Sequence, residues 1–144
     1  MSVHLVASAF DPWREIARQQ TARPELAGQY GATAVFVGSL RDFNQGRTVS
    51  AMTLEHYPGM TIKYLEKVEQ EARARWPVLD CLVIHRYGPL MPNDPIVLVA
   101  VWAAHRDAAF DACRYIIDTL KTRAPFWKQE HTPGGARWVT PEGQ

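Results

Sequence analysis

The chain is poor in the features that mark several common classes of protein. Its only cysteines, Cys81 and Cys113, form no Cys-x-x-Cys pair, so the spacing of a zinc site and that of a local redox motif are both absent. Lysine and arginine total 16 against 15 acidic residues, and the net charge of +1 gives no field that would attract nucleic acid. Any cationic site must therefore be local.

Long apolar segments are missing as well. No hydrophobic run approaches about 18 residues, and the N-terminus lacks a basic leader followed by an apolar stretch and a cleavage site. We therefore expect a cytoplasmic protein that does not enter a membrane. The motifs of nucleotide-binding loops, zinc proteases and serine hydrolases are also absent, and we expect no metal site and no cofactor.

Both cysteines fall in apolar surroundings. Cys81 opens the run Cys81-Leu82-Val83-Ile84, and Cys113 lies among alanines and isoleucines on one face of an expected helix. We interpret both as small buried hydrophobic residues rather than nucleophiles. A disulfide between them stays open from sequence alone, although a cytoplasmic location disfavours it.

The rest of the composition suits a globular protein. The chain has 144 residues, of which 47% are hydrophobic and 22% are charged, which is enough to bury a core. We find no internal repeat, low-complexity tract or linker, and expect residues 1–144 to form a single domain.

Three helices are expected from apolar periodicity and capping residues. Asp11 followed by Pro12 predicts a helix that runs to about residue 20. A stripe of apolar residues predicts a second helix over about 61–76. A third is expected after Asp107, its predicted N-cap, and should end near Thr122 because a proline follows.

Short apolar runs bounded by Gly and Pro predict strands at about residues 4–6, 32–37, 50–56, 81–86, 96–102 and 137–139. The strands between 32 and 56 and those between 81 and 102 are spaced as hairpins. We therefore predict an α+β fold of two layers, with the helices packed on one face of a largely antiparallel sheet and a small additional β subdomain.

Two lysines at the end of the third helix mark the first candidate site. Lys121 falls in the last helical turn, and Lys128 lies on the extended segment after Pro125. Phe126 and Trp127 would form apolar walls that exclude water and lower the pKa of a lysine. The alternative is a solvated pair of cations that suits the dipole of a helix C-terminus.

A second group of cationic residues flanks the start of the same helix. His105 and Arg106, with the helix dipole and free amides, would bind an anion. In the alternative, Arg106 pairs with an aspartate of its own helix in an exposed turn. Arg41, in the polar loop 39–48, would add a bidentate guanidinium for a phosphate, or remain a solvated loop residue.

Two further histidines occur at the ends of expected strands. Glu55-His56-Tyr57 and His85-Arg86 cannot place all their side chains in one pocket, because successive residues of a strand face opposite sides. We interpret both segments as structural.

Several sequence blocks together carry a family resemblance. In chain order they are Phe36-Val37-Gly38, Asn44-Gln45-Gly46, Leu54-Glu55-His56-Tyr57-Pro58-Gly59-Met60, Arg75-Trp76-Pro77, Ile84-His85-Arg86-Tyr87-Gly88, Ala104-His105-Arg106, Leu120-Lys121 and Pro125-Phe126-Trp127-Lys128. With this succession the chain resembles the large, catalytic subunit of molybdopterin synthase over roughly residues 31–139.

The resemblance implies a sulfurtransferase of molybdenum cofactor biosynthesis. It implies a homodimer that binds two copies of a small ubiquitin-like sulfur carrier in a heterotetramer. The carrier's C-terminal Gly-Gly thiocarboxylate would supply sulfur to cyclic pyranopterin monophosphate and form the molybdopterin dithiolene. By the same resemblance Lys121 and Lys128 are catalytic, and the residues that hold the substrate are Arg41, His105, Arg106 and Arg137.

The chain departs from the family pattern at two places. Trp102-Ala103 stands where smaller hydroxyl residues are common, and Pro95 where an acidic residue is common. Because Trp102 is close to His105 in sequence, it would alter the pocket wall.

Two other functions remain open from the residues. One is a non-catalytic α+β module that binds an anionic ligand or an acidic peptide tail. The other is an enzyme that forms a Schiff base through Lys121.

Overall fold

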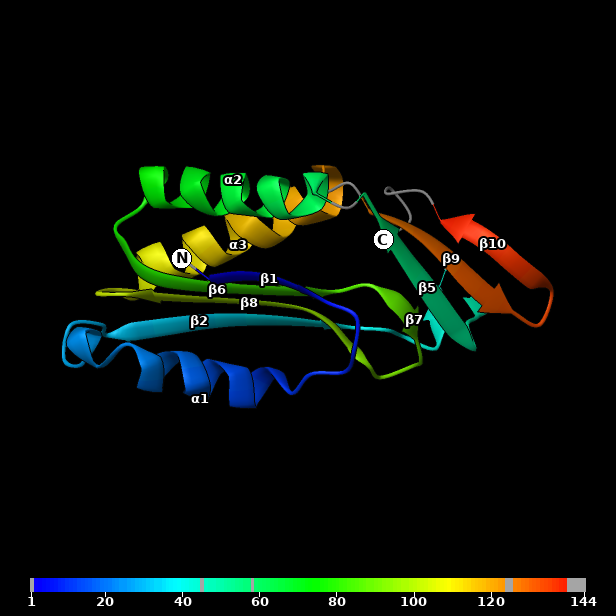
Figure 1. Cartoon of the computed structure of the whole chain (residues 1–144), viewed down its shortest axis with the longest axis horizontal. Helices are drawn as coiled ribbons and strands as arrows, with labels where there is room; N and C mark the ends of the chain where they lie inside the picture. The colour runs from blue at the N-terminus through cyan, green and yellow to red at the C-terminus, as the bar shows by residue number, and fades with distance from the viewer. Residues whose placement is uncertain (1, 45, 58, 124–125, 140–144) are drawn as a thin grey trace.

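A computed structural model describes residues 2–139 apart from 45, 58, 124 and 125. Across its larger sheet lie, in order, β1 (Ser2–Val6), β6 (Val78–Arg86), β8 (Pro95–Ala103) and β2 (Ala32–Ser39). β1 runs parallel to β6, and the other neighbouring strands are antiparallel (Figure 1). The sheet is therefore mixed but largely antiparallel, as predicted.

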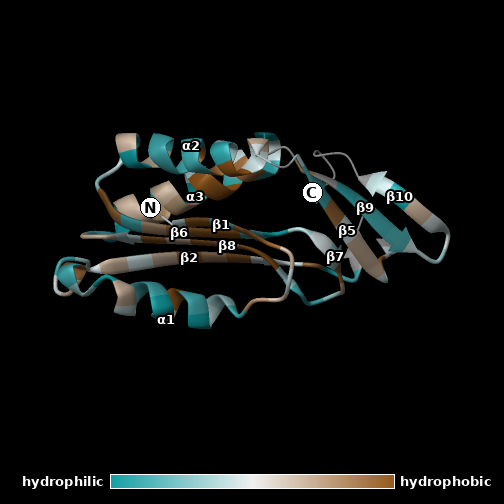
Figure 2. Cartoon of the chain, in the orientation of Figure 1, coloured by the Kyte–Doolittle hydropathy of each residue, from teal (hydrophilic) through white to brown (hydrophobic). Residues whose placement is uncertain are grey.

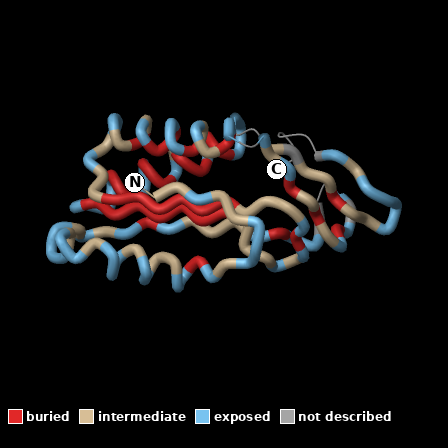
Figure 3. The backbone as a smooth tube through the Cα atoms, in the orientation of Figure 1, coloured by how far each residue is buried: buried red, intermediate tan, exposed pale blue. Residues whose placement is uncertain are grey.

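The central strands β6 and β8 are buried on both faces. Cys81, Val83 and Val99 belong to the core cluster on one face, while Leu82 and Leu98 belong to the cluster on the other. Figures 2 and 3 show these strands as the apolar, buried centre of the molecule. A strand covered on both sides needs the near-continuous apolar sequence that β6 and β8 have.

Three helices cover the sheet. They are α1 (Pro12–Ala22), α2 (Met60–Arg75) and α3 (Arg106–Arg123), with a short 3-10 turn at Pro24–Leu26. α2 and α3 pack on one face and α1 on the other (Figure 1). The α+β class is confirmed. The expectation that the helices share one face is wrong. β6 and β8 carry apolar side chains on both faces of the sheet, so both faces are covered by helices.

Capping explains where α1 begins and corrects the start of α3. The Asp11 carboxylate accepts hydrogen bonds from the amides of Trp13 at 3.0 Å and Arg14 at 3.3 Å, as its predicted N-cap role requires. Asp107, by contrast, lies inside the first turn of α3, which begins at Arg106. An acidic residue there favours the helix through the dipole instead of through a cap.

A second sheet sits at one end of the first (Figure 1). Its strands, in spatial order, are β10 (Gly135–Val139), β9 (Phe126–Thr132), β5 (Ala51–His56) and β7 (Gly88–Leu90). A two-stranded ribbon, β3 (Phe43–Asn44) with β4 (Arg47–Thr48), lies in the chain before β5. This is the predicted small β subdomain, and its core is Leu40, Val49, Met52, Leu54 and Leu90.

One predicted hairpin is therefore wrong and the other is confirmed. β2 and β5 belong to different sheets, and β5 pairs with β9 and β7 instead. β6 and β8 are antiparallel neighbours.

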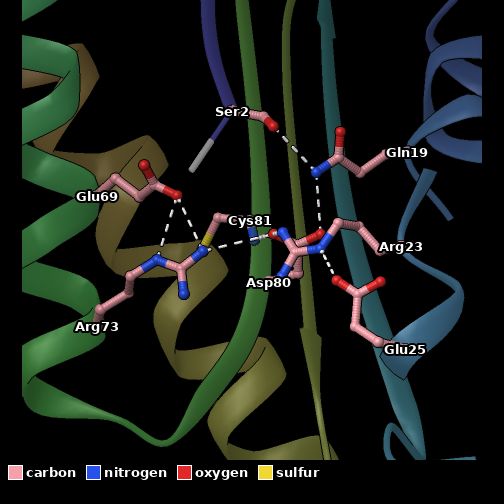
Figure 4. A network of polar contacts seen from close by, with 8 residues as sticks. All are labelled: Ser2, Gln19, Arg23, Glu25, Glu69, Arg73, Asp80 and Cys81. Carbon is pink, nitrogen blue, oxygen red and sulfur yellow. Dashed lines mark hydrogen bonds and ion pairs between the residues drawn. The ribbon is translucent and has the colours of Figure 1, made fainter. Parts of the chain in front are cut away.

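A buried polar network ties α1 and α2 to β6 (Figure 4). The carboxylate of Asp80, which is 2% exposed, lies 3.2 Å from Arg23 and 3.5 Å from Arg73. It also accepts hydrogen bonds from Gln19 at 2.9 Å and from the Cys81 amide at 3.0 Å. These contacts satisfy a buried charge that would otherwise be costly.

Trp102 packs away from α3. Its indole, 2% exposed, joins the cluster beneath α1 together with Ile16 and Tyr30. Trp102 therefore does not itself form part of a pocket wall near His105. Among the described residues, no helix is long and apolar enough to cross a membrane.

Candidate active site

The two candidate lysines lie on either side of the passage from α3 into β9. Lys121 is exposed in the last turn of α3, and Lys128 is half-buried near the start of β9. Lys128 pairs with Leu54 of β5, which is fully buried. Paired residues of neighbouring strands point to the same side of a sheet, so Lys128 lies on the inward face.

The environment of Lys128 changes its acidity. Burial, with a smaller contribution from the positive charge of Lys121, lowers the pKa of Lys128 to about 8 against the opposing effect of the Glu130 carboxylate. The ammonium groups of Lys121 and Lys128 therefore act on each other electrostatically. Phe126 supplies one apolar wall, while Pro125 and the Trp127 side chain lie outside the described residues.

Arg137 lies beside this face and is bound to a carboxylate. Its guanidinium is 2.9 Å from Glu130 in an ion pair, and its Nε donates to the same carboxylate at 3.1 Å. Glu130 is 3% exposed and directly opposite Arg137 in the β9/β10 ladder. The expected substrate-binding arginine thus helps to neutralise a buried acid two residues from Lys128.

Two histidines complete the surroundings of the lysines. His85, at the end of β6, is 8% exposed and stacks on the Phe126 ring with 3.9 Å between ring centroids. The pKa of His85 is lowered to about 4, mainly by burial and to a smaller extent by Lys128, Lys121 and His56, while the hydrogen bond to the Arg86 carbonyl opposes the change. His85 is therefore uncharged near neutral pH.

Sequence reasoning gave these histidines no part in the site. Glu55 and Tyr57 are exposed, whereas His56 is half-buried on the side of β5 that carries Leu54, so one residue of the three does face inward. His56 pairs with Phe126 of β9. Lys128 follows Phe126 by two residues and therefore lies on the same face of that strand. The alternation along β5 indicates that His56 faces inward, but placing His56 near Lys128 also requires the pairing of β5 with β9.

Arg41 lies near the same end of the molecule. It is exposed and directly follows Leu40, whose buried side chain shares the core of the second sheet with Phe126. Its exposed guanidinium is accessible to an anion in solvent.

His105 and Arg106 lie at the opposite end of α3. Both are exposed, and Lys121 follows Arg106 by 15 residues. At 1.5 Å per residue this separation is about 22 Å along the helix axis. One chain therefore brings Lys121 and Lys128 together but keeps the His105/Arg106 pair apart from them.

The cysteines take no part in the cleft. Cys81 and Cys113 are free and buried, as predicted. Burial raises the pKa of Cys81 to about 12 and that of Cys113 to about 11, so neither is a thiolate at neutral pH. Among the described residues, no cluster of three His, Cys, Asp or Glu side chains is placed to hold a metal ion.

The fold and the site define a class: an α+β protein with a coupled lysine pair where two sheets join. Comparison with known proteins gives the family. Residues 8–123 match the family model described as MoaE protein, and the chain belongs to this family.

Individual relatives agree. The chain is 50% identical over 139 residues to the molybdopterin synthase catalytic subunit of Pseudomonas aeruginosa, covering 96% of this chain and 90% of that one. Among solved structures, the molybdopterin biosynthesis MoaE protein of Burkholderia ambifaria has a TM-score of 0.79 at 48% identity, covering 96% of this chain and 88% of that one. Molybdopterin synthase of Staphylococcus aureus has a TM-score of 0.80 at 29% identity, covering 94% and 95%.

Proposed function

We propose that this chain acts as the catalytic subunit of a molybdopterin synthase. It transfers sulfur from the thiocarboxylated C-terminus of a small carrier subunit to cyclic pyranopterin monophosphate, which yields the molybdopterin dithiolene. Family membership supports the reaction, and one observation in the chain carries it: Lys128 lies half-buried on the inward face of β9, where burial and the charge of Lys121 lower its pKa to about 8.

The lysines divide the chemistry that this reaction needs. Opening a cyclic phosphate while sulfur is added requires fixed positive charge at the phosphate and a group that passes protons. Exposed Lys121 supplies charge at the mouth of the cleft. Lys128 is mostly protonated at neutral pH, yet with a pKa of about 8 it gives up its proton readily, so it serves as the general acid.

Arginines bind the anionic substrate. Arg41 approaches the cleft from the loop after β2, where a charge-assisted contact to phosphate is worth on the order of 1.5 to 3 kcal/mol. Arg137 acts through Glu130, which it neutralises next to Lys128.

His105 and Arg106 are assigned to the second chain's pocket. Within one chain they lie about 22 Å along α3 from Lys121. In a homodimer, each copy would lend this pair to the cleft of the other. Two carriers bound to such a dimer give a heterotetramer in the cytoplasm, with residues 1–144 of each copy acting as one domain.

Mixing the purified chain with thiocarboxylated carrier and cyclic pterin tests the function. We expect dithiolene product. Carrier and pterin binding without any product would favour the binding module for an anionic ligand or acidic tail. Borohydride reduction with a carbonyl substrate should trap no adduct on Lys121, and a trapped adduct would favour the Schiff-base enzyme instead.

A further inference from the structure

A cluster of rings joins the two sheets next to the lysines. The His85 ring from β6 is nearly parallel to the Phe126 ring of β9, at 17° and 3.9 Å between centroids. His56 from β5 lies 6.3 Å from Phe126 and 4.4 Å from Tyr87, edge-on to the latter. Phe126 therefore neighbours imidazoles that come from different sheets.

A hydrogen bond locks the His85 ring in one orientation. Its Nδ1 lies 3.0 Å from the Arg86 carbonyl oxygen. A carbonyl can only accept, so Nδ1 carries the proton of the neutral ring. The ring is therefore fixed in tautomer by the backbone and in plane by Phe126.

The contact bears on Lys128 because of where Phe126 lies. Phe126 and Lys128 are two residues apart on β9 and face the same side of the sheet. Burial and the positive charge of Lys121 both disfavour the ammonium form of Lys128, and outward movement into solvent would relieve the cost of burial. An anchored Phe126 resists that outward movement, and a neutral anchor adds no third positive charge to the cleft.

We infer that His85 is a positioning residue for sulfur transfer: its imidazole, hydrogen-bonded to the Arg86 carbonyl and stacked on Phe126, holds the start of β9 and keeps Lys128 half-buried. This inference rests on the proposed function for its catalytic consequence. Its structural part concerns Lys128 alone and can be measured without any substrate.

The groups that face His85 determine what a titration of Lys128 measures. Lys121 approaches from α3, Lys128 from β9 and His56 from β5, while the Arg86 carbonyl belongs to β6 itself. Glu130 is the acid that acts on Lys128 from β9. A shift in the pKa of Lys128 therefore reports its burial and its distance from Lys121 and Glu130.

The experiment uses His85→Asn in the full-length chain. Asparagine keeps an amide donor for the Arg86 carbonyl but removes the ring that stacks on Phe126. The pKa of Lys128 is measured by NMR titration with labelled lysine, and the single-turnover rate is measured with thiocarboxylated carrier and cyclic pterin. The matched control is His4→Asn, because His4 is an exposed histidine on the edge strand β1.

In His85→Asn we expect the pKa of Lys128 to rise by about one unit or more toward 10.5. The single-turnover rate should fall about tenfold or more, as for a misplaced catalytic group, with carrier affinity close to that of the parent. His4→Asn should change none of these. If His85→Asn does not fold, Phe126→Leu removes the same stacking contact from the other side and should give the same pair of changes.

A folded variant in which Lys128 keeps its parent pKa would overturn the inference, whatever its rate. So would a raised pKa with an unchanged rate. If the parent chain itself forms no product, the proposed function fails, but the Lys128 titration still decides whether His85 positions that side chain.

Discussion

At the scale of single residues, burial and a neighbouring charge together set the chemistry of Lys128. Burial alone penalises an ammonium group, and Lys121 adds like-charge repulsion. Glu130 opposes both, but Arg137 already shares its charge. The net effect leaves a lysine that exchanges its proton close to neutral pH.

The coupling between the lysines predicts a result that needs no substrate. Lys121→Gln removes one positive charge while keeping a side chain of similar length, so the pKa of Lys128 should rise from about 8. NMR titration of labelled lysines would follow it, with the Lys128 signal assigned by its loss in Lys128→Gln. An unchanged titration in Lys121→Gln would show that the two groups do not share a cleft.

Sulfur should not pass through the chain's own cysteines. Both thiols are buried and have raised pKa values, so neither offers a thiolate to the carrier. We expect the double variant Cys81→Ala/Cys113→Ala, if it folds, to convert the pterin at close to the parent rate. A folded variant that binds thiocarboxylated carrier but transfers no sulfur would show that at least one of the two cysteines is needed for the reaction.

At the scale of elements, local signals predicted the helices well. Asp11 and Pro12 place an N-cap and a proline in the positions that start α1. Lys121 and Lys128 were also found locally, because a helix must end before Pro125 and the chain must continue extended. Capping and proline act over a few residues, so their effect can be read directly from the sequence.

Strand pairing could not be predicted in the same way. Alternation in β5 shows which side chains are buried, but not that its neighbour is β9, more than 70 residues later in the chain. The parallel pairing of β1 with β6 is equally non-local. His56 and His85 were missed as neighbours of the lysines for this reason, since they reach the cleft from two sheets.

The buried network around Asp80 ties elements together far from the cleft. Asp80→Asn keeps the shape of the side chain but leaves Arg23 and Arg73 with less negative charge. We expect the free energy of unfolding to fall by about 2 kcal/mol, less than for a fully buried pair because both arginines reach solvent. The activity of the folded variant should not change.

Asp118→Asn provides the control for this denaturation experiment. Asp118 pairs with Arg114 at 3.6 Å on the surface of α3, where both side chains are more than half exposed. Its loss should cost at most about 0.5 kcal/mol. Equal effects of the two substitutions would mean that the Asp80 network adds no more than a surface ion pair.

At the scale of the whole molecule, α3 separates two halves of the predicted site. Lys121 lies at its C-terminal end and Arg106 at its N-terminal end, so the proposed site, which uses both residues, would draw on two copies of the chain. The family resemblance suggested these residues but not how far apart they lie. His105, Arg106 and Lys121 belong to one short stretch of sequence, yet a helix of this length separates its two ends.

A shared pocket predicts complementation between inactive variants. In a mixed dimer of Lys128→Ala and Arg106→Ala, one pocket carries both defects and the other carries none. Co-refolding equal amounts should therefore restore roughly a quarter of the parent rate, because about half the dimers are mixed and each has one intact pocket. Activity that stays at the level of the separate variants would place Arg106 and Lys128 in the same pocket of one chain, or remove Arg106 from the site.

The pH dependence of a single turnover, in the parent and in Lys128→Gln, tests the central claim most directly. If the ammonium of Lys128 is the general acid, the parent rate is highest below pH 8 and falls as pH rises through about 8, where Lys128 loses its proton. Lys128→Gln should bind the carrier but react slowly, without that inflection. A Lys128→Gln chain that reacts at the parent rate with the parent pH profile would contradict the account.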